Sequence, residues 1–97
     1  MIAHVVLFKF KPGVDRGDKR VPVAVAAMQA LPGKIPAIKT WQHGFNVTED
    51  ADAWDYGLNS AFASESDLHA YFEHPAHLPV LEQWNEIATL AFTDFKL

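Results

Sequence analysis

The sequence predicts an α+β domain with a ferredoxin-like βαββαβ order, in which a four-stranded antiparallel sheet carries its helices on one face. Three observations support this fold class. Several segments alternate apolar and polar side chains as strands do, others repeat apolar residues at helical spacing, and the two kinds follow one another in the βαββαβ order. The chain has 97 residues, so residues 1–97 are expected to form a single domain.

The first predicted strand is "IAHVVLFKFK", residues 2–11, which ends at Pro12 and Gly13. Both of its faces are largely apolar, so we expect both to be covered, one by helices and the other by a partner subunit. Alternation places Ile2, His4, Val6, Phe8 and Phe10 on one face and Ala3, Val5, Leu7, Lys9 and Lys11 on the other.

Residues 18–31, "DKRVPVAVAAMQAL", are predicted to form a helix. Asp18 is expected to cap it, and Pro22 is acceptable because it falls in the first turn. The motif "PGKIP" stops the helix. The apolar stripe, with spacings of four and three, consists of Val21, Val25, Met28 and Leu31.

Two further strands are predicted at residues 37–47 and 54–63. Gly44 in the first of them suggests a bulge or a close backbone approach. Trp41, His43 and Phe45 share one face, which meets either the helices or a partner. In the second strand one face carries Trp54, Tyr56, Leu58, Ser60 and Phe62.

The last third of the chain predicts two helical pieces and a final strand. Ser64 or Ser66 is expected to cap the helix "SESDLHAYFEHP", which Pro75 ends. A second helical piece follows in "AHLPVLEQWNEI", and residues 88–96 form the last strand. Because the helices cover only one face of this sheet, a second subunit is the simplest cover for the other.

Composition excludes several classes of protein. The formal charge is −4, from 8 basic and 12 acidic side chains, and the basic residues are scattered, which argues against a nucleic-acid partner. There is no cysteine and therefore no thiol chemistry. The apolar start of the chain lacks the features of a signal peptide, and no apolar run reaches the ~18 residues of a membrane-spanning helix. We therefore expect a cytoplasmic protein without a membrane partner.

The stretch "AYFEHPAH" places Tyr71, His74 and His77 around a proline. Residues six apart diverge by about 240° on an unbroken helix, but the break at Pro75 can return His77 towards Tyr71. A neutral imidazole and a phenol would then suit acid–base chemistry. The alternative is structural: His77 bonds backbone near the break, and Tyr71 packs with its hydroxyl towards water.

A metal site is the third interpretation of these histidines. His69, His74 and His77 have the spacing H-x4-H-x2-H, with a proline in the second interval. This is not a standard zinc pattern, so no metal is predicted. His74 is instead expected at a helix C-terminus, where a histidine interacts well with the dipole and the free carbonyls.

Four segments together resemble stress-responsive α/β-barrel (Dabb) domains: "HVVLFKFKPGV", "HGFNVTED", "WDYGLNSAF" and "AYFEHPAHLPVLE", with "FTDF" at the end. The resemblance implies a homodimer in which two sheets pack face to face into a dimeric α+β barrel. It also implies an apolar pocket between each sheet and its own helices. Most members have no assigned activity. One type, the plant olivetolic-acid-type polyketide cyclase, needs no cofactor and uses a tyrosine and a histidine that fall on Tyr71 and His77.

The resemblance leaves three hypotheses. The first is a homodimeric domain that binds a small apolar or aromatic carbonyl compound without chemistry, with no cofactor. The second is a cofactor-independent cyclase, lyase or isomerase with Tyr71 and His77 as acid–base pair. The third is a purely structural dimer with a filled interior. His4 matches a histidine of the cyclase, whereas Tyr56 stands where the cyclase has a further histidine. The expected binding residues are His4, Tyr56, Phe8 and Phe62.

Overall fold

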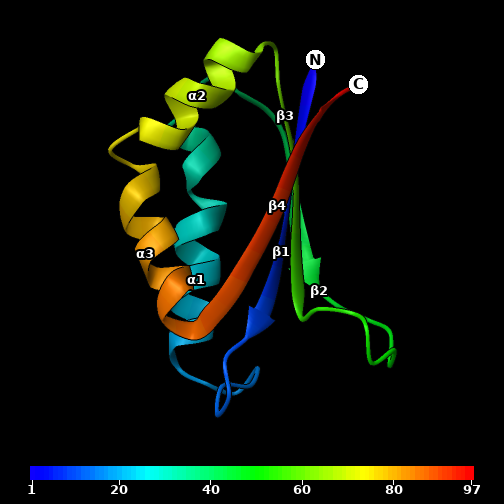
Figure 1. Cartoon of the computed structure of the whole chain (residues 1–97). Helices are drawn as coiled ribbons and strands as arrows, with labels where there is room; N and C mark the ends of the chain where they lie inside the picture. Colours follow the sequence, from blue (N-terminus) through cyan, green and yellow to red (C-terminus); the bar gives the residue numbers. More distant parts are fainter.

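The computed structural model describes residues 1–97, which form a four-stranded antiparallel sheet with helices on one face (Figure 1). The strand order across the sheet is β2-β3-β1-β4, which confirms the predicted ferredoxin-like α+β fold. None of the helices combines the length and the apolar character that a membrane-spanning helix requires. The elements in chain order are β1 (Ile2–Phe10), α1 (Arg20–Gln29), the 3₁₀ turn η1 (Leu31–Gly33), β2 (Ile38–Phe45), β3 (Tyr56–Phe62), α2 (Glu65–Glu73), α3 (His77–Ile87) and β4 (Ala88–Lys96).

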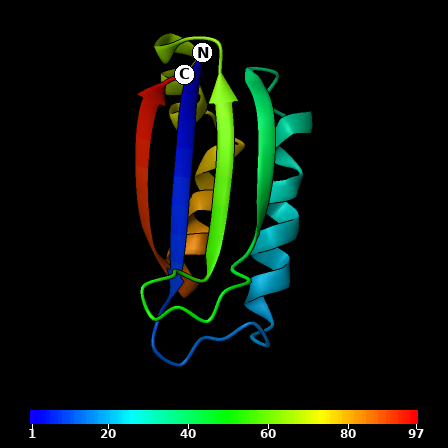
Figure 2. The same cartoon turned by 90° about the vertical axis from the view of Figure 1, so that its right-hand side faces the viewer.

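Strand β1 lies in the middle of the sheet, between β3 and β4 (Figure 2). Its alternate residues Ile2, Val6 and Phe8 are buried in the core shared with the helices. In the register, Val6 lies opposite Leu58 of β3 and Phe92 of β4, and opposed residues of antiparallel strands point to the same face. The helix-facing side of the sheet is therefore the side of the hydrophobic core, as the alternation of β1 predicts.

Figure 2 shows the sheet from the side that carries no helix. We call this side the open sheet face. Two of its large apolar side chains are exposed, Leu7 by 46% and Phe95 by 49%. Lys9 is the charged residue on this face. Alternation and register assign to the open sheet face Ala3, Val5, Leu7, Lys9, Gln42, Asn59, Ala61, Ala91, Thr93 and Phe95.

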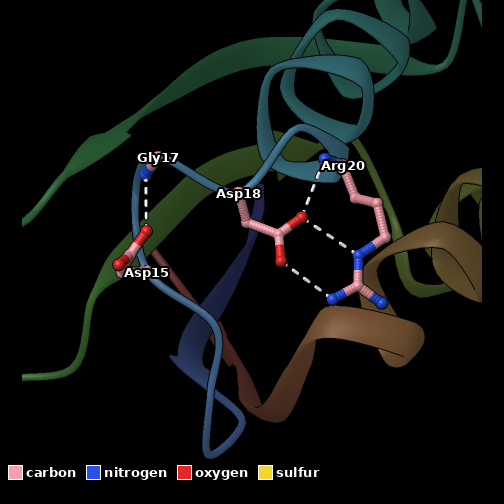
Figure 3. A network of polar contacts seen from close by, with 4 residues as sticks. All are labelled: Asp15, Gly17, Asp18 and Arg20. Atoms are coloured by element: carbon pink, nitrogen blue, oxygen red, sulfur yellow. Dashed lines mark hydrogen bonds and ion pairs between the residues drawn. The ribbon is translucent and has the colours of Figure 1, made fainter.

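The turn before α1 is held by two aspartates (Figure 3). Asp15 Oδ1 accepts the Gly17 N–H over 2.8 Å, and Asp18 Oδ1 accepts the Arg20 N–H over 2.9 Å. The helix begins at Arg20 with Lys19 at the N-cap, so the prediction that Asp18 is the cap residue is wrong by one position. The Asp18 carboxylate also pairs with the Arg20 guanidinium over 2.9 Å, and these hydrogen bonds lower the pKa of Asp18 to about 2.

Helices α2 and α3 are separated by the predicted proline break. Ser64 caps α2, because its hydroxyl accepts the Asp67 N–H over 3.2 Å. Pro75 lies in the gap between the two helices. His74 occupies the C-cap of α2, as expected, but its Nδ1 accepts the Ala76 N–H over 3.0 Å instead of donating to a helix carbonyl. The ring therefore stabilises the turn between the helices.

Gly44 does not form the predicted bulge. It pairs regularly with Gly57, and an added Cβ at Gly44 would meet nothing within 4 Å. The irregularity of this strand pair lies between Ile38 and Thr40, near the start of β2. The extra residue is therefore accommodated where the strand begins, and the glycine is not required for it.

The predicted strand at residues 54–63 begins two residues later, at Tyr56. Asp55 is turned towards the end of β1, where its carboxylate accepts the Phe10 N–H over 2.7 Å and its own N–H donates to the Phe8 carbonyl over 2.9 Å. These bonds fix the loop against β1 before the β3 ladder starts, so Trp54 lies outside the strand.

Candidate functional site

A cavity of about 260 Å³ lies between the sheet and the helices. Its wall comes from β1, β3 and β4 on one side and from α2 and α3 on the other, with Met28 added from the end of α1 and Leu31 from η1. Of its 14 lining residues, 12 are hydrophobic when Tyr71 is counted among them, and the other two are His4 and His77. A concave apolar wall with a few placed polar groups is typical of small-molecule sites.

Tyr71 and His77 meet across the helix break. Tyr71 lies in α2, His77 is the first residue of α3, and their ring centroids are 4.3 Å apart. The His77 Nδ1–H donates to the Phe72 carbonyl over 3.2 Å. Because a carbonyl only accepts, the neutral ring carries its proton on Nδ1, and its Nε2 remains a free acceptor. The arrangement combines the two interpretations of the sequence: His77 bonds backbone at the break and also contacts Tyr71.

Burial decides the ionisation of this pair. It raises the pKa of Tyr71 well above its ordinary value of 10, so the phenol stays protonated and serves as a hydrogen-bond donor. Burial also lowers the pKa of His77 from 6.5. The hydrogen bond to Phe72 raises the pKa of His77, while the charges of His4 and His74 lower it further. His77 is therefore a neutral imidazole at neutral pH.

His4 and Asp94 form a hydrogen-bonded pair between neighbouring strands. They lie directly opposite each other in β1 and β4, and His4 Nδ1 is 2.5 Å from Asp94 Oδ1. The His4 ring is enclosed by aromatic rings, with the centroids of Tyr71 and Phe72 at 5.8 and 5.2 Å. The carboxylate holds the imidazole in one orientation at the cavity wall.

Of the predicted site residues, His4, Phe8, Tyr71 and His77 line the cavity, whereas Tyr56 and Phe62 do not. Phe62 is fully buried behind Tyr71, with ring centroids 4.9 Å apart. Phe62 thus supports the wall without forming it.

The Tyr56 hydroxyl is 2.6 Å from Nδ1 of His43, whose Nε2 is 2.6 Å from Oε1 of Gln29 in α1. These contacts place the face of β2 that carries His43 towards the helices. Burial raises the pKa of Tyr56 and lowers the pKa of His43. Tyr56 therefore belongs to a polar link between the sheet and α1.

Sequence reasoning missed Asp94, Trp84 and Phe92. The alternation of β4 places Leu90, Phe92 and Asp94 on the same face as His4. A carboxylate on this otherwise apolar face could therefore have been identified from the sequence as a candidate site residue. Trp84 is 1% exposed and lines the cavity, and its indole N–H has no hydrogen-bond partner. No sequence pattern distinguishes that tryptophan from an ordinary core residue.

No group of three or more His, Cys, Asp or Glu side chains is arranged to hold a metal ion. Two of the three histidines considered above already make other bonds, since His74 accepts from Ala76 and His77 donates to Phe72. The residues present do not form a metal centre.

The fold and the cavity define a ferredoxin-like α+β domain with an apolar cavity between its sheet and its helices. The chain belongs to the stress responsive A/B barrel domain (Dabb) family, which matches it over residues 2–97. A Streptomyces coelicolor protein described as uncharacterized is 38% identical over 96 residues, which cover 99% of each chain.

Two solved structures extend the comparison. A dimeric ferredoxin-like protein of unknown function from Bacteroides fragilis has a TM-score of 0.84 and 28% identity, over 99% of this chain and 95% of that one. A dimeric ferredoxin-like protein of unknown function from Thermobifida fusca has a TM-score of 0.86 and 25% identity, over 99% of this chain and 90% of that one.

Proposed function

We propose that this chain is a homodimeric domain that binds a small apolar or aromatic carbonyl or phenolic compound in the cavity between its sheet and helices. The observation that carries the proposal is the cavity of about 260 Å³ with 12 hydrophobic residues among its 14 lining residues. A ligand of matching size gains dispersion contacts with a wall whose atoms face no protein partner. It also removes its own apolar surface from water.

The polar groups of the wall support a ligand with both an acceptor and a donor. The Tyr71 hydroxyl stays protonated and is the donor of the wall, whereas the unpaired Trp84 N–H is closed off from solvent. Nε2 of His77 is a free acceptor. A carbonyl oxygen would satisfy a donor, and a hydroxyl group would satisfy the imidazole. Leaving a buried polar group unpaired costs roughly 1–3 kcal/mol, so such a ligand would be preferred over a pure hydrocarbon.

Thermal unfolding in the presence of small phenols, aromatic ketones and linear polyketones tests ligand binding. At about ten times its Kd, a ligand that binds only the native state stabilises it by about 1.4 kcal/mol. For a domain of this size, that corresponds to a rise in Tm of roughly 6–11 °C. If no compound of these classes raises the Tm, the proposal is contradicted.

Two substitutions in one helix provide a matched control. Leu81 lines the cavity, whereas Leu78 of the same helix is 47% exposed and does not line it. Leu81→Trp is expected to fill the cavity and abolish the rise in Tm. Leu78→Trp makes the same chemical change outside the cavity and is expected to leave the rise in Tm intact. Equal loss in both variants would indicate that the ligand binds elsewhere.

A second candidate function is a cofactor-independent cyclase, lyase or isomerase acting on a small carbonyl compound. The contact between Tyr71 and His77, with ring centroids 4.3 Å apart in the cavity wall, favours it. A neutral imidazole takes a proton α to a carbonyl, and a protonated phenol donates to the developing enolate oxygen. His77→Gln should then abolish turnover of an accepted compound while ligand binding persists. Unchanged turnover in that variant contradicts this assignment.

The homodimer is supported by the open sheet face. Val5 and Leu7 of the inner strand β1 and Phe95 of the edge strand β4 are apolar, and the charged Lys9 lies towards the end of β1. An antiparallel sheet with one apolar face exposed needs a cover, and a second copy of the same face is self-complementary under two-fold symmetry. The two similar structures described as dimeric agree with this arrangement.

A further inference from the structure

Two imidazoles line the cavity, and both approach Tyr71. The centroid of His77 is 4.3 Å from that of Tyr71, and the centroid of His4 is 5.8 Å from it. Only one of these rings has a partner that balances a positive charge. Because an uncompensated charge in an apolar site is expensive, this difference decides which ring accepts a proton from a bound ligand.

His77 has no carboxylate partner. Its Nδ1–H donates to a neutral group, the Phe72 carbonyl. The ion pairs of the structure are His4–Asp94 and Asp18–Arg20, and neither involves His77. Burial lowers the pKa of His77, and the charge of His4 lowers it further. An imidazolium at His77 would thus be desolvated, and it would also be repelled once His4 holds a proton. The ring is suited to accept a hydrogen bond from a ligand and not to hold its proton.

His4 is built differently. Its side chain is 5% exposed, and its Nδ1 is 2.5 Å from the Asp94 carboxylate. The side chain of Asp94 is 27% exposed and lines a separate polar groove of about 220 Å³ with Glu65, His69 and Lys96. The carboxylate therefore touches the buried ring on one side and water on the other. It remains hydrated while it balances a charge that forms inside the apolar cavity.

We propose that the His4–Asp94 pair, and not His77, is the proton acceptor of the cavity, and that its ligands are phenols or enolisable carbonyl compounds held as their anions. This inference rests on the proposed function of the cavity as a ligand site, and it replaces the second candidate function, in which His77 is the base. The O–H bond of a phenol, or the α C–H bond of a ketone, breaks as an N–H bond forms at Nε2 of His4. The electron pair stays on the ligand. Asp94 is a positioning residue that keeps the ring proton on Nδ1 and balances the imidazolium.

The tautomer of His4 tests this assignment without a ligand. An asparagine amide can donate to Nδ1, which moves the ring proton to Nε2 and removes the acceptor. ¹⁵N NMR of the imidazoles at alkaline pH should show Nδ1–H at His4 in the wild type and Nε2–H in Asp94→Asn. Asp52→Asn removes a carboxylate from an exposed loop and should leave His4 as Nδ1–H. The same His4 tautomer in Asp94→Asn as in the wild type would overturn the proposal.

The second measurement uses 4-nitrophenol, whose anion absorbs visible light, at a pH where the free probe is largely neutral. Binding to the wild type should produce the phenolate band, and Asp94→Asn should bind the probe with that band largely lost. 4-Nitroanisole, which has no acidic proton, controls for binding alone. A probe that raises the Tm without a phenolate band overturns the inference. So does a band that survives in Asp94→Asn but is lost in His77→Gln. A probe that does not bind the wild type contradicts both the inference and the proposed function for phenols.

Discussion

Replacement of Trp84 by phenylalanine tests the energetics of the cavity wall. The indole is 1% exposed in α3 and packs against Phe8 and Tyr56, with ring centroids 4.4 and 5.2 Å away. Trp84→Phe removes buried ring atoms equivalent to roughly two CH₂ groups, which costs about 1.5 kcal/mol at ~0.8 kcal/mol each. It also removes an N–H that has no partner, and the burial of such a donor costs roughly 1–3 kcal/mol. The two effects oppose each other.

We therefore expect the free energy of unfolding of Trp84→Phe to lie within about 1 kcal/mol of the wild type. Phe62→Leu is the matched control. Phe62 is fully buried and carries no polar group, and the substitution removes a similar number of atoms. It should cost roughly 1.5–3 kcal/mol. Urea unfolding followed by far-UV circular dichroism, at one protein concentration, measures both. If Trp84→Phe destabilises as much as Phe62→Leu, the indole N–H is satisfied in solution and the reasoning fails.

Two further predictions concern pH and assembly. The pKa of His77 is lowered from 6.5 in the folded state, so below about pH 6.5 the unfolded state binds more protons than the folded state does. The free energy of unfolding therefore decreases as the pH falls from about 6.5 to the lower pKa that His77 has in the folded protein. The pKa of His43 is lowered as well, so His77→Phe should make the loss of stability between about pH 6.5 and 5 shallower without removing it. Denaturant titrations at several pH values measure this, and a free energy of unfolding that falls with pH as steeply as in the wild type would contradict the prediction. Leu7→Asp places a charge in the open sheet face and should reduce the mass in light scattering from twice 10.8 kDa to one chain, whereas a retained dimer would mean that another surface joins the subunits.

Local patterns in the sequence were sufficient for the strands and helices. The alternation of Ile2, Val6 and Phe8 defines which side of β1 is buried, because successive side chains of a strand point to opposite faces. Ser64 and Pro75 mark the start of α2 and the break after it, because a cap and a missing N–H act within one turn. Asp18 and Gly44 show the limit of such arguments. The cap position shifted by one residue, and the glycine proved unnecessary for the bulge.

The sequence by itself determined that Tyr71 and His77 flank a helix break, since both residues and the proline between them lie within one short stretch. Only the tertiary structure decided what surrounds them. Asp94 reaches His4 because β1 and β4 are neighbours although 90 residues separate the pair, and no local pattern encodes that register. Likewise Tyr56 turned to His43 because the hydrogen-bonding partner of a side chain depends on which strands and helices pack together. Hydrophobic periodicity is a local property of the chain, whereas charge compensation inside a cavity is a property of the folded whole.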